Sequence, residues 1–111
     1  MAQDLGDRPW YNDWPQGVPK SIDYPEISLG EMLRQTASQY PDDKAIIFLD
    51  SVLTYRQLDD YVDRLATAFA NLGLGKGDTI ALMLPNSHQF VVAFYAVQRL
   101  GGVATAINPT Y

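Results

Sequence analysis

The sequence predicts an α/β domain in which helices pack on a mostly parallel sheet. Two observations carry this prediction. Helical and strand-like segments alternate along the chain after residue 26, and one of the strand-like segments is apolar on both of its faces. A strand that is buried on both sides is typical of parallel sheets covered by helices, whose successive strands are joined by right-handed crossovers.

The composition limits the classes of protein to which the chain can belong. Its 111 residues support one domain, and the 47% of them that are hydrophobic argue against disorder. Eight Lys and Arg against thirteen Asp and Glu give a net charge of -5, which argues against a nucleic-acid partner. No apolar run approaches the roughly 20 residues of a transmembrane helix, and the polar N-terminus does not resemble a secretory signal. The absence of cysteine excludes disulfides and thiolate sites and fits a reducing cytoplasm.

Residues 1–26 differ in composition from the rest of the chain. Recurrent prolines disfavour a helix here, because each removes a backbone donor; they are Pro9, Pro15, Pro19 and Pro25. The segment is nevertheless too apolar for a solvated tail, since it holds Trp10, Tyr11, Trp14, Ile22 and Tyr24. We expect residues 1–26 to form an extended arm that lies on a folded surface, its own or a partner's. The alternative, a proline-rich ligand, is disfavoured because no PxxP motif occurs.

Residues 27–111 form the predicted α/β part, and its first helix begins after Ser28. Ser28 and Glu31 have capping-box spacing, and Pro41 ends the helix. The predicted apolar face is Met32, Leu33, Thr36, Ala37 and Tyr40. A buried strand is predicted over Ala45–Leu49, and Asp50-Ser51 is predicted to turn the chain into a short strand, Val52–Thr54.

The second helix is predicted over Tyr55–Leu72, with Thr54 and Gln57 as its capping box. Its apolar stripe is Leu58, Val62, Leu65, Phe69 and Leu72. The stripe spans little more than two heptads before Gly73 ends the helix, so a core helix is favoured over a coiled-coil seam.

The last three elements are a strand, a helix and a strand. Thr79–Leu84 is the segment that is apolar on both faces. Ser87 is predicted to cap a helix that runs to Leu100, and Val103–Ile107 is the last strand. The predicted core face of this helix is Phe90, Val91, Phe94 and Val97.

Three groups of residues could carry chemistry, and each has a more ordinary structural interpretation. The cluster from Gly73 to Gly77 leads from a helix into a strand, the reverse of a phosphate loop, so we expect a turn with Lys76 facing solvent. His88 has no partner at ligand or triad spacing and is expected to be a partly exposed structural residue. The acidic residues of the second helix are expected to form a solvated face rather than a metal site; they are Asp59, Asp60 and Asp63, with Arg64 among them.

Short motifs from about residue 44 to Tyr111 follow one another in a distinctive order. They are Leu53-Thr54-Tyr55-Arg56-Gln57-Leu58-Asp59, Val62-Asp63-Arg64-Leu65-Ala66, Leu72-Gly73, Lys76-Gly77-Asp78, Ile80 to Leu84, Pro85-Asn86-Ser87, Ala93, Arg99-Leu100-Gly101-Gly102 and Ile107-Asn108-Pro109-Thr110-Tyr111. In this order they resemble the opening of the AMP-forming acyl-CoA synthetases, within the adenylate-forming superfamily. The arm, with Arg8-Pro9-Trp10, Pro15-Gln16-Gly17-Val18-Pro19 and Ile22, resembles the leader of bacterial long-chain fatty acid–CoA ligases.

The resemblance implies a parent enzyme that uses ATP and Mg²⁺ to convert a fatty acid to an acyl-adenylate and then forms acyl-CoA with coenzyme A. It also implies that residues 27–111 are a partial N-terminal subdomain of the adenylate-forming fold. The family's phosphate loop, adenine-binding motif and catalytic lysine do not occur; the only lysines are Lys20, Lys44 and Lys76, none in such a context. We therefore expect a catalytically incomplete fragment with no catalytic, cofactor-binding or metal-binding residue, which does not bind these cofactors tightly.

Two alternatives stay open at this point. The parent enzyme could activate an aryl or medium-chain acid instead, or the chain could be a small non-enzymatic α/β module whose arm docks a partner. We also expect a cytoplasmic location, with peripheral membrane contact of the parent left open. Finally, we expect the fragment to self-associate, because about three helices are too few to cover the sheet and a strand edge is left unpaired.

Overall fold

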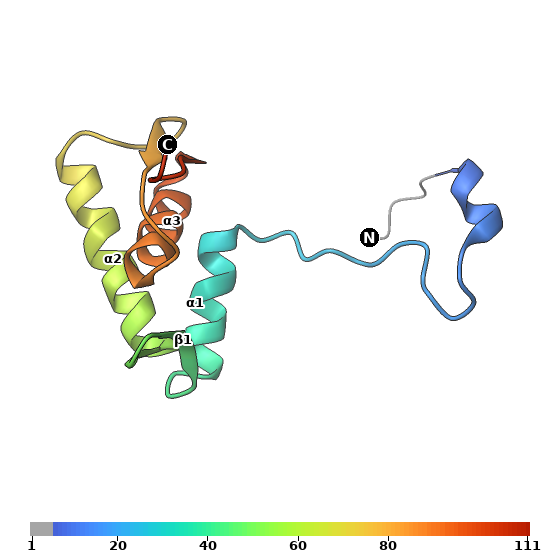
Figure 1. The fold of residues 1–111 in the computed structure, drawn as a ribbon, viewed down its shortest axis with the longest axis horizontal. Helices are drawn as coiled ribbons and strands as arrows, with labels where there is room; N and C mark the ends of the chain where they lie inside the picture. Colours follow the sequence, from blue (N-terminus) through green and yellow to red (C-terminus); the bar gives the residue numbers. More distant parts are fainter. Residues whose placement is uncertain (1–5) are drawn as a thin grey trace.

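The computed structural model describes residues 6–111, in which three α-helices are accompanied by two small sheets and an N-terminal arm (Figure 1). In chain order the elements are η1 (Pro9–Asp13), α1 (Leu29–Gln39), β1 (Lys44–Phe48), β2 (Ser51–Thr54), α2 (Tyr55–Asn71), β3 (Thr79–Leu82), α3 (His88–Leu100) and β4 (Val103–Ala106). The predicted order of helices and strands after residue 26 is confirmed. No helix within residues 6–111 is both long enough and apolar enough to cross a membrane.

The strands form two separate pairs rather than one mostly parallel sheet. β1 and β2 are an antiparallel hairpin, and β3 and β4 are a parallel pair in which Thr79 faces Val103 and Leu82 faces Ala106. The α/β class is therefore confirmed, but the expectation of a mostly parallel sheet holds only for the second pair. In that pair α3 forms the crossover between the two strands.

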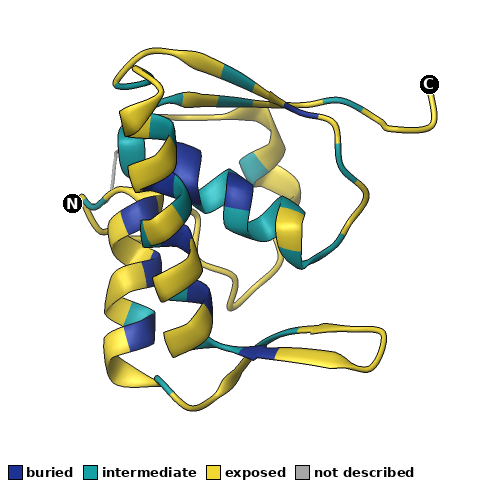
Figure 2. Ribbon diagram, turned by 90° about the vertical axis from the view of Figure 1, so that its left-hand side faces the viewer, coloured by how far each residue is buried: buried dark blue, intermediate teal, exposed yellow. Residues whose placement is uncertain are grey.

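The core lies where the three helices meet. Its buried residues come from all three helices and are Leu33, Leu58, Val62, Ala66 and Ala96. Figure 2 shows these buried positions along the facing sides of the helices, while most of the two strand pairs is exposed. The predicted core positions Leu65 and Phe69 pack against this cluster but are only partly buried.

Polar caps begin all three helices. The Thr54 hydroxyl accepts from the Gln57 N–H at 3.3 Å, and the Gln57 side chain accepts from the Thr54 N–H at 3.0 Å, which is the predicted capping box. Ser28 caps α1 by accepting from the Glu31 N–H, and Ser87 caps α3 by accepting from the Phe90 N–H. These local hydrogen bonds explain why the starts of the helices could be read from the sequence.

Several predicted core residues are exposed. Leu72 is 77% exposed because it is the C-cap residue of α2 and lies beyond the contact with α3. The strand predicted to be buried on both faces is not: Met83 is 59% exposed, and within β3 only Leu82 is buried. β1 is likewise exposed at Ile47, because a two-stranded hairpin that projects from the helices has one covered face at most (Figure 2).

The hairpin turn lies one residue earlier than predicted. Phe48 pairs with Ser51, so the turn residues are Leu49 and Asp50, rather than Asp50 and Ser51. Leu49 has φ = 52°, a left-handed conformation that a leucine rarely adopts, and its side chain is 83% exposed. The prediction failed because the sequence offers no Gly or Asn to mark the turn.

The described part of the arm, residues 6–26, does not lie on the three helices. It leaves α1 and runs away from them, and it contains the short helix η1 instead of being extended throughout (Figure 1). Its contacts are internal: the Trp14 indole N–H donates to the Val18 carbonyl at 2.9 Å, and the Tyr11 and Trp14 rings meet edge to face at 5.4 Å. The expectation that the arm lies on a folded surface, its own or a partner's, stays a prediction, and its first part, residues 1–5, lies outside the described residues.

Candidate functional site

The strongest candidate site is a crevice at the carboxyl ends of the two parallel strands. This is the edge at which α/β proteins bind their ligands, since the following helix presents its N-terminus there. The cavity has a volume of about 480 Å³. It is lined by Leu84, Pro85, Asn86, Phe90, Ala106, Ile107, Asn108, Pro109 and Thr110.

Three local features shape the crevice. The Ile107 N–H donates to the Leu82 carbonyl at 3.0 Å, which extends the parallel pairing to the rim. Ser87 caps α3 and also donates to the Pro85 carbonyl at 3.0 Å, which holds the helix start against the strand end. On the opposite wall, the Asn108 side chain accepts from both the N–H and the hydroxyl of Thr110, at 3.0 and 2.8 Å. The crevice is therefore built from turns with defined hydrogen bonds.

The chemistry available in the crevice is limited to hydrogen bonding and shape. Its polar side chains are two amides and a hydroxyl, and none of its lining residues is acidic or basic. It can orient a bound group through these atoms and through the helix start, but it supplies no general acid, general base or activated nucleophile. A triphosphate with Mg²⁺ does not fit these residues, and residues 6–111 hold no cluster of three or more side chains suited to a metal ion.

A charged cluster joins α3, whose start lines the crevice, to α1 and α2. The Arg99 guanidinium on α3 donates to Asp59 Oδ1 at 2.7 Å and to Asp63 Oδ1 at 2.9 Å on α2. It also donates to the Gly30 carbonyl of α1 at 3.3 Å, and Arg34 of α1 donates to Asp63 at 2.8 Å. The Arg99 side chain is only 12% exposed, so these bonds are formed in a partly desolvated position.

This cluster corrects one prediction about the acidic face of α2. Asp59 and Asp63 face α3 and form part of the helix interface, whereas Asp60 pairs with Arg64 on the solvent side at 2.9 Å, as a solvated face would. Sequence reasoning also missed the role of Gly30. A Cβ at this position would lie 3.2 Å from the Arg99 Cα, so glycine allows α1 and α3 to approach closely. The i, i+4 spacing of Asp59 and Asp63 was the signal that could have indicated a shared partner.

The glycine cluster from Gly73 to Gly77 and His88 have the structural roles expected of them, and the structure adds one observation about His88. Gly73 and Gly77 have φ values of 89° and 85° in the turn between α2 and β3, where the Gly75 N–H donates to Asp78 Oδ2 and Lys76 is exposed. His88 is partly exposed in the first turn of α3, with its ring 5.9 Å from that of Phe48. Its Nε2 atom, however, is buried and has no hydrogen-bond partner.

Comparison with known proteins agrees with this architecture. The family model described as "AMP-binding enzyme" matches residues 33–111. The long-chain-fatty-acid–CoA ligase of Bacillus subtilis is 35% identical over 94% of this chain and 19% of its own length, and that of Yersinia pestis is 38% identical over 92% of this chain and 18% of its own. The solved N-terminal domain of FACL13 from Mycobacterium tuberculosis superposes with a TM-score of 0.72 at 38% identity, covering 76% of this chain and 22% of that one.

The fold is thus that of the N-terminal subdomain of adenylate-forming enzymes. More specifically, the chain belongs to the AMP-binding enzyme family. It spans about a fifth of the length of the curated relatives it matches. The family resemblance expected from the sequence motifs is confirmed.

Proposed function

We propose that this chain is the N-terminal part of a fatty acid–CoA ligase that activates its acid with ATP and then forms acyl-CoA. The observation that carries the proposal is the 35–38% identity to long-chain-fatty-acid–CoA ligases over more than nine-tenths of the chain. A carboxylate is a poor electrophile, so the parent enzyme must first convert it to an acyl-adenylate with a good leaving group. ATP with Mg²⁺ and coenzyme A supply that chemistry when bound to the parent enzyme.

Within this function, the chain contributes a structural framework and one wall of a ligand site, and it does not contribute the groups that react. The crevice at the ends of β3 and β4 orients a bound group through Asn86, Asn108 and the start of α3. Because it carries no charged side chain, phosphate charge and the metal must be held by residues outside this chain. This division of roles between the chain and the rest of the parent enzyme supports the expectation that no catalytic, cofactor-binding or metal-binding residue lies within the chain.

A chimeric enzyme tests the proposal. The segment of the Bacillus subtilis ligase that aligns with this chain is replaced by residues 6–111, and ATP-dependent formation of palmitoyl-CoA is measured. We expect the chimera to be active, and the same relative without its N-terminal segment to be inactive. A folded chimera without any acyl-CoA formation, with palmitate or with shorter or aryl acids, would contradict the proposal.

The chimera also separates the proposed substrate from the alternatives. If the crevice influences the choice of acid, the ratio of kcat/KM for palmitate to that for octanoate and benzoate shifts between the chimera and its parent. An unchanged ratio assigns acid selection to the remainder of the ligase. A small interaction module with no enzymatic parent would yield no activity with any of the three acids.

We further propose a cytoplasmic location and self-association of the isolated chain. The absence of cysteine supports the location. Self-association is supported by exposed apolar residues in both strand pairs, Ile47 in β1 and Val103 in β4, and by Met83 directly after β3. It is also supported by the parallel pair itself, because parallel strands are almost always found inside larger, covered sheets.

A further inference from the structure

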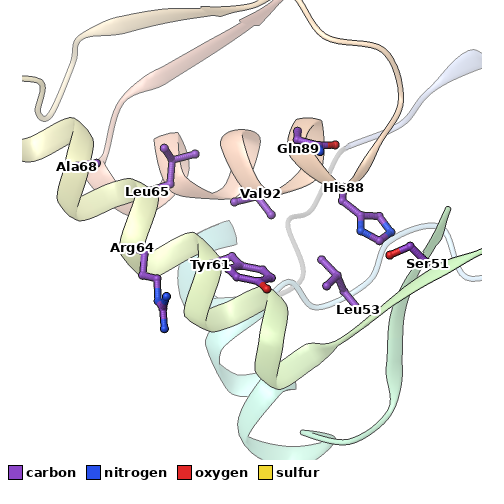
Figure 3. A pocket seen from close by; sticks show the side chains of 9 residues that line it. All are labelled: Ser51, Leu53, Tyr61, Arg64, Leu65, Ala68, His88, Gln89 and Val92. Atoms are coloured by element: carbon purple, nitrogen blue, oxygen red, sulfur yellow. The ribbon is translucent and has the colours of Figure 1, made fainter.

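A second cavity, of about 640 Å³, lies between β2, α2 and α3 and shares no lining residue with the crevice at the strand ends (Figure 3). Its apolar floor comes from all three elements and consists of Leu53, Leu65, Ala68 and Val92. The volume lies within the range of about 300–1,000 Å³ that is typical of sites for small molecules. Along α2 the lining runs from Tyr61 to Ala68, a length of roughly 10 Å by helix geometry. The cavity is therefore large enough for an alkyl chain of medium length.

The polar groups in the wall of this cavity favour an anion over a cation. Ser51, Tyr61 and Gln89 each carry a hydroxyl or amide that can donate a hydrogen bond, and Arg64 supplies a positive charge. Within the described part of the chain, no carboxylate lines the cavity. Arg64 Nε pairs with Asp60 Oδ2 at 2.9 Å, and within residues 6–111 its two Nη atoms form no further ion pair. These Nη groups can therefore pair with the carboxylate of a ligand.

The charge and the apolar floor are arranged as an amphiphile requires. The Arg64 side chain is 73% exposed, so a head group that pairs with it keeps much of its hydration. Figure 3 shows Arg64 at one end of the lining and His88 at the other, with Leu53 and Val92 between them. The apolar surface continues past His88 to the ring of Phe48, which is 38% exposed and whose centroid lies 5.9 Å from that of the imidazole. A chain that begins at Arg64 thus meets apolar surface along its length.

We propose that this cavity binds a fatty acid anion, at a site separate from the crevice. The carboxylate pairs with the Nη groups of Arg64 at the solvent edge, and the alkyl chain covers the floor of Leu53, Leu65 and Val92 toward His88. Burial of the chain supplies most of the affinity, and the ion pair selects the head group. The inference follows from the lining of the cavity and does not depend on the ligase activity.

The test uses the whole 111-residue chain and decanoate below its micelle concentration, with the affinity measured by isothermal titration calorimetry. Each buried CH₂ group contributes up to about fourfold in affinity, so we expect octanoate to bind about 4- to 15-fold more weakly than decanoate. Decylammonium should also bind more weakly than decanoate, although the net charge of -5 attracts a cation to the chain as a whole. Equal affinities for the two head groups would overturn the anion site.

Two substitutions on α2 should change the affinity for decanoate in opposite directions. Arg64→Met removes the cation and should weaken binding by about two- to fivefold, as for an exposed ion pair. Asp60→Asn removes the carboxylate that competes for Arg64 and should strengthen binding by about two- to fivefold. Arg56→Met is the control, because Arg56 pairs with Asp42 and does not line the cavity. Equal weakening by Arg64→Met and Arg56→Met would assign the effect to net charge and overturn the head-group contact.

A matched pair of cavity-filling variants locates the alkyl chain. Ala68 is exposed on α2, so Ala68→Phe covers the floor without disturbing the core, and it should weaken decanoate binding by about 10-fold or more. Ala106→Phe makes the same change at an exposed alanine that lines the crevice, and it should change the affinity by less than about twofold.

His88 gives a second readout, because it is the only histidine in the chain. Its imidazole ¹⁵N resonances should shift when decanoate is added to the wild-type chain and stay in place in Ala68→Phe. Undiminished binding in Ala68→Phe would overturn the site, and weakening by Ala106→Phe alone would move the fatty acid to the crevice. Neither result bears on the activity of the chimeric ligase, so the two proposals fail separately.

Discussion

The guanidinium of Arg99, on α3, bonds to both of the other helices. It bonds two carboxylates of α2 and a carbonyl of α1 from a position that is 12% exposed. Removing it leaves Asp59 without its ion-pair partner in a partly desolvated interface, while Asp63 keeps its bond to Arg34. The loss at Asp59 is more costly than the loss of an exposed pair. Arg99 therefore contributes to the position of α1, together with the Arg34–Asp63 pair and the packing of Leu33 in the core.

We expect Arg99→Met to lower the free energy of unfolding by about 1–3 kcal/mol, a range reduced for the partial exposure of the two carboxylates. Urea unfolding followed by circular dichroism measures the change. Arg64→Met is the matched control, because Arg64 pairs with Asp60 on the solvent side, and it should cost less than about 0.5 kcal/mol. Equal losses in the two variants would show that the cluster contributes no more than a surface pair.

Asn108 is the residue through which the crevice can be tested. Its side chain holds the turn of Thr110 by two accepted hydrogen bonds. In the chimeric ligase, Asn108→Ala should lower kcat/KM by about 10-fold or more, because a small misplacement of an orienting group is costly. Asn108→Asp keeps an accepting oxygen and should retain more of the activity. An Asn108→Ala chimera with unchanged kcat/KM would remove the crevice from the substrate site.

At the scale of elements, sequence reasoning succeeded where the determinants are local. Thr54, Ser28 and Ser87 each accept a hydrogen bond from a residue three positions later, so the starts of α2, α1 and α3 are encoded in short segments. Burial was predicted less well, because it depends on which element covers a residue. Met83 and Leu72 belong to apolar patterns but have no covering element. The cavity beside His88 was not predictable, since β2, α2 and α3 contribute to it from distant positions.

The β1–β2 hairpin is the element whose sequence fits its structure least well. Leu49 holds a left-handed backbone conformation that asparagine adopts more readily, and its exposed side chain makes little use of its apolar surface. We expect Leu49→Asn to stabilise the chain by about 0.5–1 kcal/mol, measured by urea unfolding. Leu49→Ala, which keeps the unfavourable φ, should give no such gain. A destabilised Leu49→Asn variant would mean that the leucine side chain has a packing role.

At the scale of the whole molecule, we expect the chain to supply a framework and not the groups that activate a carboxylate. We predict that the 111-residue chain alone does not release pyrophosphate from ATP in the presence of palmitate. The physical reason is that its crevice has no charged residue to stabilise phosphate charge. A coupled pyrophosphate assay against a protein-free blank measures this. Saturable, acid-dependent release by the purified chain would show that the reacting groups lie within residues 1–111.

The strand edges of the parallel pair are a surface through which copies of the isolated chain can associate. β3 and β4 form a sheet of two strands, so each strand has one unpaired edge, and such edges can add further copies without limit. Val103 in β4 is 52% exposed, and a lysine there should disfavour edge pairing by its charge. We expect Val103→Lys to lower the mean mass of the associated species in light scattering across a dilution series. An unchanged mass of the associated species in Val103→Lys would contradict association through the strand edges.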